Sequence, residues 1–210
     1  MSYRLVIFDF DGTLADSFPW VISAMDEIAD RFGFRRVRDG ELEELRHCDA
    51  REVMRRLGIS RWKLPMIARY VRSRMAQDVH QIEMFPGAGA LIESLAEAGI
   101  KMAVVSANGE STIRKVLGPH AQRISYFSGG VSLFGKRGKL LQMCRKAGVS
   151  ASEVMVIGDE IRDVNAARKA KMTFGAVSWG LTKPAAMRSA GVDLLFESMG
   201  DISRVLLPQR

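Results

Sequence analysis

Cysteine is scarce in this chain, and no apolar run approaches the length needed to cross a bilayer. Its 210 residues include two cysteines, Cys48 and Cys144, which are too few for a disulfide framework and are not spaced like metal ligands. We expect each to be a small apolar core residue. The first apolar run begins too close to Met1 to follow a charged leader. The sequence therefore predicts a cytoplasmic protein in a reducing compartment, with no membrane partner.

Acidic residues are outnumbered, since 24 Asp and Glu stand against 31 Lys and Arg and give a net charge of +7. This balance favours an anionic partner, either nucleic acid or a small phosphorylated substrate. Many cations lie between Arg31 and Arg74, but no aromatic residues are interleaved with them as base-stacking would require. A solvated helix surface is the simpler explanation, so we expect no nucleic-acid partner. The sequence leaves a monomer and a homodimer equally open.

Residues 15–85 show a helical pattern. Between Phe18 and Phe32 apolar residues recur at helical spacing, with Ser17 as a possible cap and Gly33 at the end. The members of this predicted buried stripe are Phe18, Val21, Ile22, Met25, Ile28, Ala29 and Phe32. Further helices are expected around Asp49–Leu57 and Lys63–Val79. We also expect Trp20, Trp62 and Phe85 to lie in the core.

After Phe85 the pattern changes to helices alternating with short apolar strands, which is typical of a parallel sheet. The strands are expected at Met102–Val105, Val154–Ile157, Phe174–Val177 and Asp193–Phe196. The predicted fold is α/β, a doubly wound parallel sheet built from residues 1–14 and 86–210. An all-helical unit, residues 15–85, is inserted after the first strand, where it could close over the mouth of the sheet as a lid.

The strongest chemical signal is the stretch Asp9–Leu14, with the sequence Asp-Phe-Asp-Gly-Thr-Leu. It directly follows the apolar run Leu5–Phe8, so two carboxylates stand at the end of a predicted strand. Side chains two positions apart on a regular strand share a face, and Gly12 permits a sharp turn, so Asp9 and Asp11 could serve one reaction centre. Two close anions repel each other, and a divalent cation that prefers oxygen ligands, such as Mg²⁺, would relieve this repulsion.

Two later segments place further polar groups at strand ends. Ser106, Ala107 and Asn108 follow one strand and offer a hydroxyl and backbone donors for anionic oxygens. Asp159 and Asp163 follow another strand with one helical turn between them, so both could approach the same cation. Helix capping by these two aspartates is the alternative explanation.

A basic loop lies between those segments. Its Lys136 could neutralise a phosphate and an attacking carboxylate, although Lys139 competes for the role and an exposed lysine in a turn is the simpler explanation. The stretch Gly130–Lys136 also fits the glycine spacing of a nucleotide-binding phosphate loop. Arg137 stands where that loop needs a hydroxyl for magnesium, so we disfavour this interpretation.

These four segments, in this order, resemble the haloacid dehalogenase superfamily, whose members share a Rossmann-like core and mostly transfer phosphoryl groups. The resemblance implies that Asp9 is the nucleophile and that Asp11 is the general acid and base. It further implies phosphate binding by Ser106, Ala107, Asn108 and Lys136, and a Mg²⁺ site formed by Asp9, Asp11 through its backbone carbonyl, Asp159 and Asp163. The helical insert looks like the cap of phosphoglycolate phosphatases, which act on small phosphorylated metabolites.

Two functional alternatives remain beside a phosphatase. A sugar phosphomutase would use the same aspartyl phosphate, and a non-catalytic basic module would bind nucleic acid through the arginine-rich insert. Within the insert, Arg46 and Arg51 could clamp a substrate carboxylate as bidentate forks.

Overall fold

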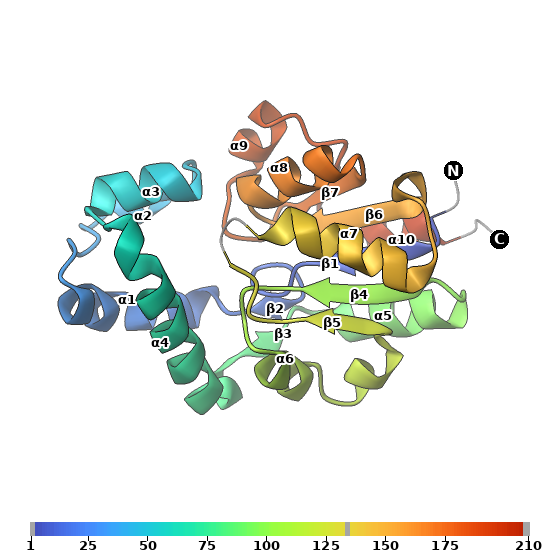
Figure 1. Cartoon of the computed structure of the whole chain (residues 1–210), viewed down its shortest axis with the longest axis horizontal. Helices are drawn as coiled ribbons and strands as arrows, with labels where there is room; N and C mark the ends of the chain where they lie inside the picture. Colours follow the sequence, from blue (N-terminus) through green and yellow to red (C-terminus); the bar gives the residue numbers. More distant parts are fainter. Residues whose placement is uncertain (1–2, 133–134, 208–210) are drawn as a thin grey trace.

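A six-stranded parallel sheet forms the centre of the molecule (Figure 1). The structure is a computed structural model, and it describes residues 3–132 and 135–207. In spatial order the strands are β5 (Tyr126–Ser128), β4 (Lys101–Val105), β1 (Leu5–Phe8), β6 (Val154–Gly158), β7 (Thr173–Val177) and β8 (Leu194–Phe196). This order confirms the predicted doubly wound α/β fold. Strand β5, which is short, was not predicted.

Strand β1 lies in the middle of the sheet, hydrogen-bonded in parallel to β4 and to β6. Its residues are apolar throughout because both faces of the sheet are covered by helices. Val6 and Phe8 belong to one core, whereas Leu5 and Ile7 belong to the other. This alternation follows from the two-residue period of a strand, and it places whatever follows Phe8 at the carboxyl edge of the sheet.

Helices cover the two faces of the sheet separately, as Figure 1 shows for α7 and α8 above it and for α5 and α6 below it. The helices of the core unit are α5 (Ala88–Glu97), α6 (Glu110–Leu117), α7 (Lys136–Ala147), α8 (Ile161–Ala170), α9 (Pro184–Ser189) and α10 (Met199–Leu206). Short 3₁₀ helices lie at Gly118–Arg123 and Ala151–Glu153.

The insert consists of α1 (Phe18–Phe32), α2 (Glu41–Leu45), α3 (Ala50–Leu57) and α4 (Leu64–Gln77), with 3₁₀ turns at Arg61–Lys63 and Val79–Gln81. It leaves and rejoins the core unit through a two-stranded antiparallel sheet of β2 (Ala15–Asp16) and β3 (Glu83–Met84). These helices lie within the range assigned to the insert from the sequence. Its end points at residues 15 and 85 stay a prediction.

Three details of the insert differ from expectation. Ile22, predicted to lie in the buried stripe of α1, is 37% exposed, whereas Trp20 is buried in the core as expected and its indole donates a hydrogen bond to Asp78. Trp62 is 69% exposed and does not belong to the core. Ser17 occupies the N-cap position of α1, but its side chain makes no capping hydrogen bond.

The remaining general expectations concern cysteine and membranes. Cys144 is buried in the core, as predicted, whereas Cys48 is half-buried. Among the described residues, no helix is both long enough and apolar enough to cross a bilayer.

Two glycines offer a test of the packing. A Cβ atom on Gly175 in β7 would lie 2.3 Å from the ring of buried Phe196, whereas one on Gly138 in α7 would meet nothing within 4 Å. We expect Gly175→Ala to lower the free energy of unfolding by about 1–3 kcal/mol through overpacking. The same change at Gly138 should raise it by about 0.5 kcal/mol, because alanine loses less backbone entropy in a helix. Urea denaturation measures both, and equal effects at the two positions would contradict this account of the core.

Candidate active site

Polar side chains from three neighbouring strands meet at the carboxyl edge of the sheet. Asp9 follows β1, Ser106 follows β4, and Asp159 follows β6, while these strands lie side by side. All three side chains are buried. In open parallel sheets this edge is where ligands bind, so the strand order itself assembles the candidate site.

Asp9 is held by donors on both carboxylate oxygens. Its Oδ1 accepts a hydrogen bond of 2.8 Å from the amide of Phe10, and its Oδ2 lies 2.8 Å from the Lys136 ammonium. Burial raises the pKa of Asp9, but the charges of Lys136 and Arg162 and these hydrogen bonds outweigh it, so the pKa is below its ordinary value. Asp9 is therefore an ionised carboxylate in a site shielded from water.

Lys136, rather than Lys139, is the lysine that reaches the acids. Its ammonium lies between Asp9 and Asp163, 2.7 Å from Oδ1 of the latter. Burial lowers the pKa of Lys136, but the charges of Asp163 and Asp9 outweigh that effect and raise the pKa above its ordinary value. The Lys139 ammonium instead donates to Gln142 on the same helix. The phosphate-loop alternative stays untested, because residues 133–134 of its loop lie outside the described residues.

Asp11 turns toward the strand β4 side of the site. The Ser106 hydroxyl and the Asn108 amide group donate to its two oxygens, over 3.3 Å and 3.4 Å. Burial, and then the charge of Asp9, raise the pKa of Asp11 to about 6. Strand β1 ends at Phe8, so Asp9 and Asp11 occupy a turn. The expectation that they share a face of a regular strand is wrong. The pKa values of Asp9 and Asp11 are shifted in opposite directions from their ordinary value.

The turn after β4 is preorganised by its own hydrogen bonds. The Ser106 hydroxyl accepts from the Asn108 amide over 2.9 Å, and the Asn108 side chain accepts from Gly109 over 2.8 Å. Ala107 is half-buried between them. The predicted role of these residues in binding a phosphate stays a prediction.

Three buried carboxylates could hold a metal ion. Oxygens of Asp9, Asp159 and Asp163 lie within 4.8 Å of one another. Among the described residues Oδ2 of Asp163 has no hydrogen-bond partner. Burial, and then the charges of Glu160, Asp9 and Asp163, hold the pKa of Asp159 well above its ordinary value. A cation would relieve this repulsion, and an all-carboxylate set suits Mg²⁺, so these residues fit such an ion.

The two alternative roles for Asp159 and Asp163 as helix caps are wrong. The N-cap residue of α8 is Glu160, and no side chain caps this helix. The Asp11 carboxylate does not belong to the group formed by Asp9, Asp159 and Asp163. Its predicted contribution through the backbone carbonyl stays a prediction.

Asp159 packs so closely against Gly12 and Gly180 that neither of these two positions has room for a side chain. A Cβ atom on Gly12, which has φ +72°, would lie 2.2 Å from Oδ2 of Asp159. One on Gly180 would lie 2.1 Å from the Asp159 Cβ. Thr13 donates to Oδ1 over 3.1 Å, and the Leu181 amide donates to Oδ2 over 2.8 Å. These contacts fix the orientation of the carboxylate.

Several of the residues around the acids were not predicted from the sequence. Thr13 lies within the first motif, so its position could have indicated its role. Arg162 adds a second cation beside Asp9 and pairs with Glu160 over 2.5 Å. The Ser17 hydroxyl hydrogen-bonds Asp11 instead of capping α1. The turn at Gly180 carries no pattern that would have identified it.

Beside Ser17, the helical part of the insert contacts the site through Met75 and Arg46. Met75 of α4 is buried with its sulfur 2.7 Å from the Asn108 side-chain nitrogen. Arg46, at the end of α2, donates to the carbonyl oxygens of Gly180 and Leu181, each over 2.9 Å. The expectation that Arg46 clamps a substrate carboxylate is therefore wrong, because two of its nitrogens are bound to the core unit. For Arg51 the expectation stays a prediction.

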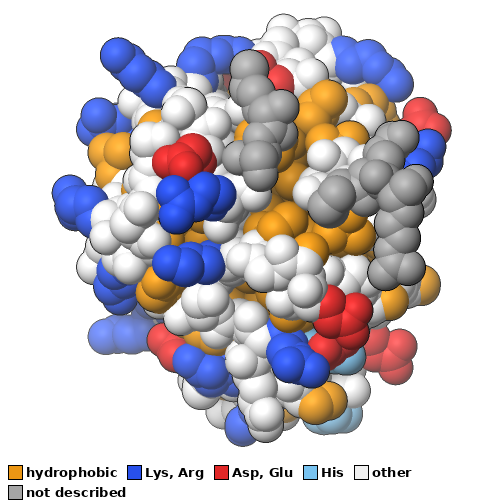
Figure 2. All heavy atoms as spheres, turned by 90° about the vertical axis from the view of Figure 1, so that its right-hand side faces the viewer, with side chains coloured by type: hydrophobic (Ala, Val, Ile, Leu, Met, Phe, Trp, Pro, Cys, Tyr) orange, Lys and Arg blue, Asp and Glu red, His pale blue; other side chains and the backbone are white. Residues whose placement is uncertain are grey.

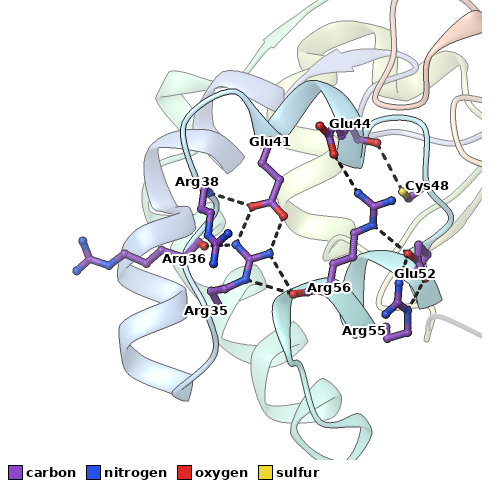
Figure 3. A network of polar contacts seen from close by, with 9 residues as sticks. All are labelled: Arg35, Arg36, Arg38, Glu41, Glu44, Cys48, Glu52, Arg55 and Arg56. Atoms are coloured by element: carbon purple, nitrogen blue, oxygen red, sulfur yellow. Dashed lines mark hydrogen bonds and ion pairs between the residues drawn. The ribbon is translucent and has the colours of Figure 1, made fainter.

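The arginine-rich insert is largely neutralised by its own acids, as Figure 3 shows. Arg35 makes a bidentate pair with Glu41, and Arg55 and Arg56 share Glu52. On the face remote from the insert, Figure 2 shows Lys and Arg as separate groups with acidic and uncharged side chains between them. The face in Figure 2 presents no continuous basic stripe of the kind typical of nucleic-acid-binding proteins among the residues that the structure describes.

Comparison with known proteins agrees with this geometry. The family model described as haloacid dehalogenase-like hydrolase matches residues 6–177. A protein named phosphoglycolate phosphatase from Synechococcus elongatus is 31% identical over 201 residues, which cover 95% of each chain. A hydrolase from Pseudomonas syringae superposes with a TM-score of 0.78 at 25% identity over 97% of each chain. A predicted phosphatase from Clostridium acetobutylicum superposes with a TM-score of 0.82 at 20% identity over 99% of each chain.

Thermal unfolding tests the three-carboxylate site without reference to activity. Mg²⁺ should raise the midpoint, since a ligand present at about 100 times its dissociation constant stabilises the folded state by roughly 2.7 kcal/mol. Asp163→Asn should abolish this increase by removing one ligand, and EDTA should reverse it. Glu97→Gln, at an exposed position, is the control and should retain it. An undiminished increase in Asp163→Asn would contradict the assignment.

Proposed function

Because the chain belongs to the haloacid dehalogenase-like hydrolase family and has three buried carboxylates that could hold a metal ion, we propose that it hydrolyses a small phosphate monoester with the aid of Mg²⁺. The chief support is the buried grouping of Asp9 with Asp159, Asp163 and Lys136. This grouping supplies a carboxylate that stays ionised and a place for a cation beside it. A phosphoryl group needs both, since it is itself anionic.

Asp9 is the proposed nucleophile. Its carboxylate oxygen attacks phosphorus, the bond from phosphorus to the ester oxygen breaks, and an aspartyl phosphate forms. The depressed pKa of Asp9 keeps the attacking oxygen unprotonated. Lys136 and the Phe10 amide hold the carboxylate in one orientation before substrate arrives.

Asp11 is the proposed general acid and base. In the first step it gives its proton to the departing ester oxygen, so the alcohol leaves uncharged. In the second step it takes a proton from the water that attacks phosphorus, and inorganic phosphate is released while Asp9 is regenerated. Its hydrogen bonds with Ser106 and Asn108 turn it away from Lys136, which separates the two roles.

The transferring group is proposed to lie among Ser106, Ala107, Asn108 and Lys136, whose hydroxyl, amides and ammonium can hold its oxygens. Asp9, Asp159, Asp163 and the backbone carbonyl of Asp11 would hold the Mg²⁺. When bound, this ion supplies charge neutralisation between the anionic nucleophile and the anionic substrate. Thr13 and Leu181 keep Asp159 oriented for that purpose.

Phosphoglycolate is the proposed substrate, on the strength of the Synechococcus elongatus relative that carries this name. The contact of Met75 with Asn108 brings the insert over the phosphate-binding turn, where it could enclose a small ester. A sugar phosphomutase is the second candidate, since the same aspartyl phosphate could be returned to a sugar. It predicts isomerisation of a sugar phosphate without release of free phosphate.

Phosphate release from a panel of phosphorylated metabolites tests the proposal. With Mg²⁺ the unaltered protein should hydrolyse phosphoglycolate faster than the other esters, and EDTA should stop it. Asp9→Asn should lower turnover by at least about 10⁴-fold, because an amide is a far weaker nucleophile than a carboxylate. Full activity in this variant would refute the nucleophile assignment. Isomerisation without free phosphate would favour the mutase.

The two lysines make a matched pair of variants. Lys136→Met should lower kcat/KM by at least about 10²-fold, since it removes the charge that holds Asp9 and the phosphate. Lys139→Met should stay within about twofold of the unaltered protein, because Lys139 contacts Gln142 and no acid of the site. Steady-state kinetics with the best ester of the panel measures both. The reverse order of effects would show that Lys139 is the active lysine.

A further inference from the structure

A single turn of chain after β7 lies between the insert and the candidate metal site. It comprises residues 179–183, which make hydrogen bonds in both directions. Toward the site, the Leu181 amide donates to Oδ2 of Asp159 and the Thr182 amide donates to the Asp159 carbonyl oxygen over 3.2 Å. Trp179 donates to the carbonyl oxygen of Thr13, which itself contacts Asp159. The turn therefore acts as a support for this carboxylate.

Toward the insert, the same turn is held by Arg46. Its Nε donates to the Leu181 carbonyl oxygen and its Nη2 to that of Gly180, so the planar guanidinium spans two successive peptide groups. The Arg46 carbonyl oxygen in turn accepts from the Lys183 amide over 2.9 Å. The Arg46 side chain is 17% exposed and its guanidinium lies over the ring of Phe18, 5.1 Å from the centroid. The Arg46 Nη1 also donates to Glu43 over 3.2 Å, so all three guanidinium nitrogens have partners.

The two sets of contacts share one peptide group, because the Gly180 carbonyl accepts from Arg46 and the adjoining Leu181 amide donates to Asp159. Leu181 binds Asp159 through its amide and Arg46 through its carbonyl oxygen. Gly180 accepts from Arg46 while it packs directly against the Asp159 Cβ. Because residues 180–181 pack closely against Asp159, a movement of the insert that displaces this turn also displaces the Asp159 carboxylate.

We propose that Arg46 is a positioning residue for Asp159, so that docking of the insert onto residues 180–181 sets the geometry of the metal-binding carboxylate. The inference rests on the proposed function in requiring a divalent cation at Asp159. It assigns to Arg46 no contact with substrate. Closure of the insert and completion of the cation site are then one event.

The direction in which the Mg²⁺ affinity changes when Arg46 is removed distinguishes a positioning role from a purely electrostatic one. Arg46 is a cation close to a cation site, so its removal should tighten Mg²⁺ binding if only Coulomb repulsion mattered. If Arg46 positions Asp159, its removal should weaken binding. Loss of hydrogen-bond partners behind metal ligands weakens metal affinity by about 10–100-fold.

Calorimetric titration with MgCl₂, repeated with MnCl₂ and without any phosphate ester, measures this affinity directly. We expect Arg46→Gln to raise the dissociation constant about tenfold. Arg46→Lys keeps the charge but lacks the planar fork, and we expect it to weaken binding as well. A thermal scan of each variant shows whether it is folded. If Arg46→Gln does not fold, Arg46→Lys alone tests the inference.

Lys183→Gln is the matched control. Lys183 pairs with Glu43 across the same boundary, so this variant removes the same charge without removing a donor to residues 180–181. Its Mg²⁺ affinity should stay within about twofold of that of the unaltered protein. A loss as large as that of Arg46→Gln would show that attachment of the insert in general matters and would overturn the role of the fork.

Unchanged or tighter Mg²⁺ binding in both Arg46 variants would overturn the inference and leave the proposed function intact. If the unaltered protein bound neither cation, the metal-dependent function would fail and the inference with it. A higher KM for the ester at unchanged metal affinity would instead identify Arg46 as a residue that acts on substrate binding, and would also overturn the inference.

Discussion

An ammonium group shared between two buried carboxylates is the interaction on which the site depends. Lys136 lies between Asp9 and Asp163, which with Asp159 and Asp11 would otherwise repel one another in a space that water does not screen. Burial raises the pKa of Asp159, and the charges of Glu160, Asp9 and Asp163 raise it further, so the lysine does not offset the whole cost of bringing these acids together. The carboxylates of Asp9, Asp159 and Asp163 lie close enough together to hold a divalent cation, which would offset their repulsion further.

The sequence predicted the parts of the fold that depend on local pattern. Asp9 and Asp159 each directly follow a strand of mostly apolar residues, and such a strand in a parallel sheet must end at the carboxyl edge. Asp9 and Asp159 could therefore be brought together on paper from strand ends alone. Helix α1 was equally accessible, because its apolar period and the glycine after Phe32 are local features.

What escaped prediction depends on contacts between distant segments. The opposite directions taken by Asp9 and Asp11 follow from Lys136 on one side and Ser106 on the other, and neither partner lies near them in sequence. Trp20 packs into the core and its indole donates to Asp78, whereas Trp62 is 69% exposed. The turn around Gly180 passes so close to Asp159 that a side chain would not fit there. Composition alone cannot reveal such a steric requirement.

The paired strands β2 and β3 have an evolutionary consequence. Ala15 faces Met84 and Asp16 faces Glu83, so the chain departs from the core unit and returns to it at almost the same point, roughly 5 Å apart. Any segment whose own ends lie that close could replace the helices between them without rerouting a single strand of the large sheet. The insert could thus change in length and sequence without altering the strand order, as long as the contacts of Arg46 and Met75 with the core unit are kept.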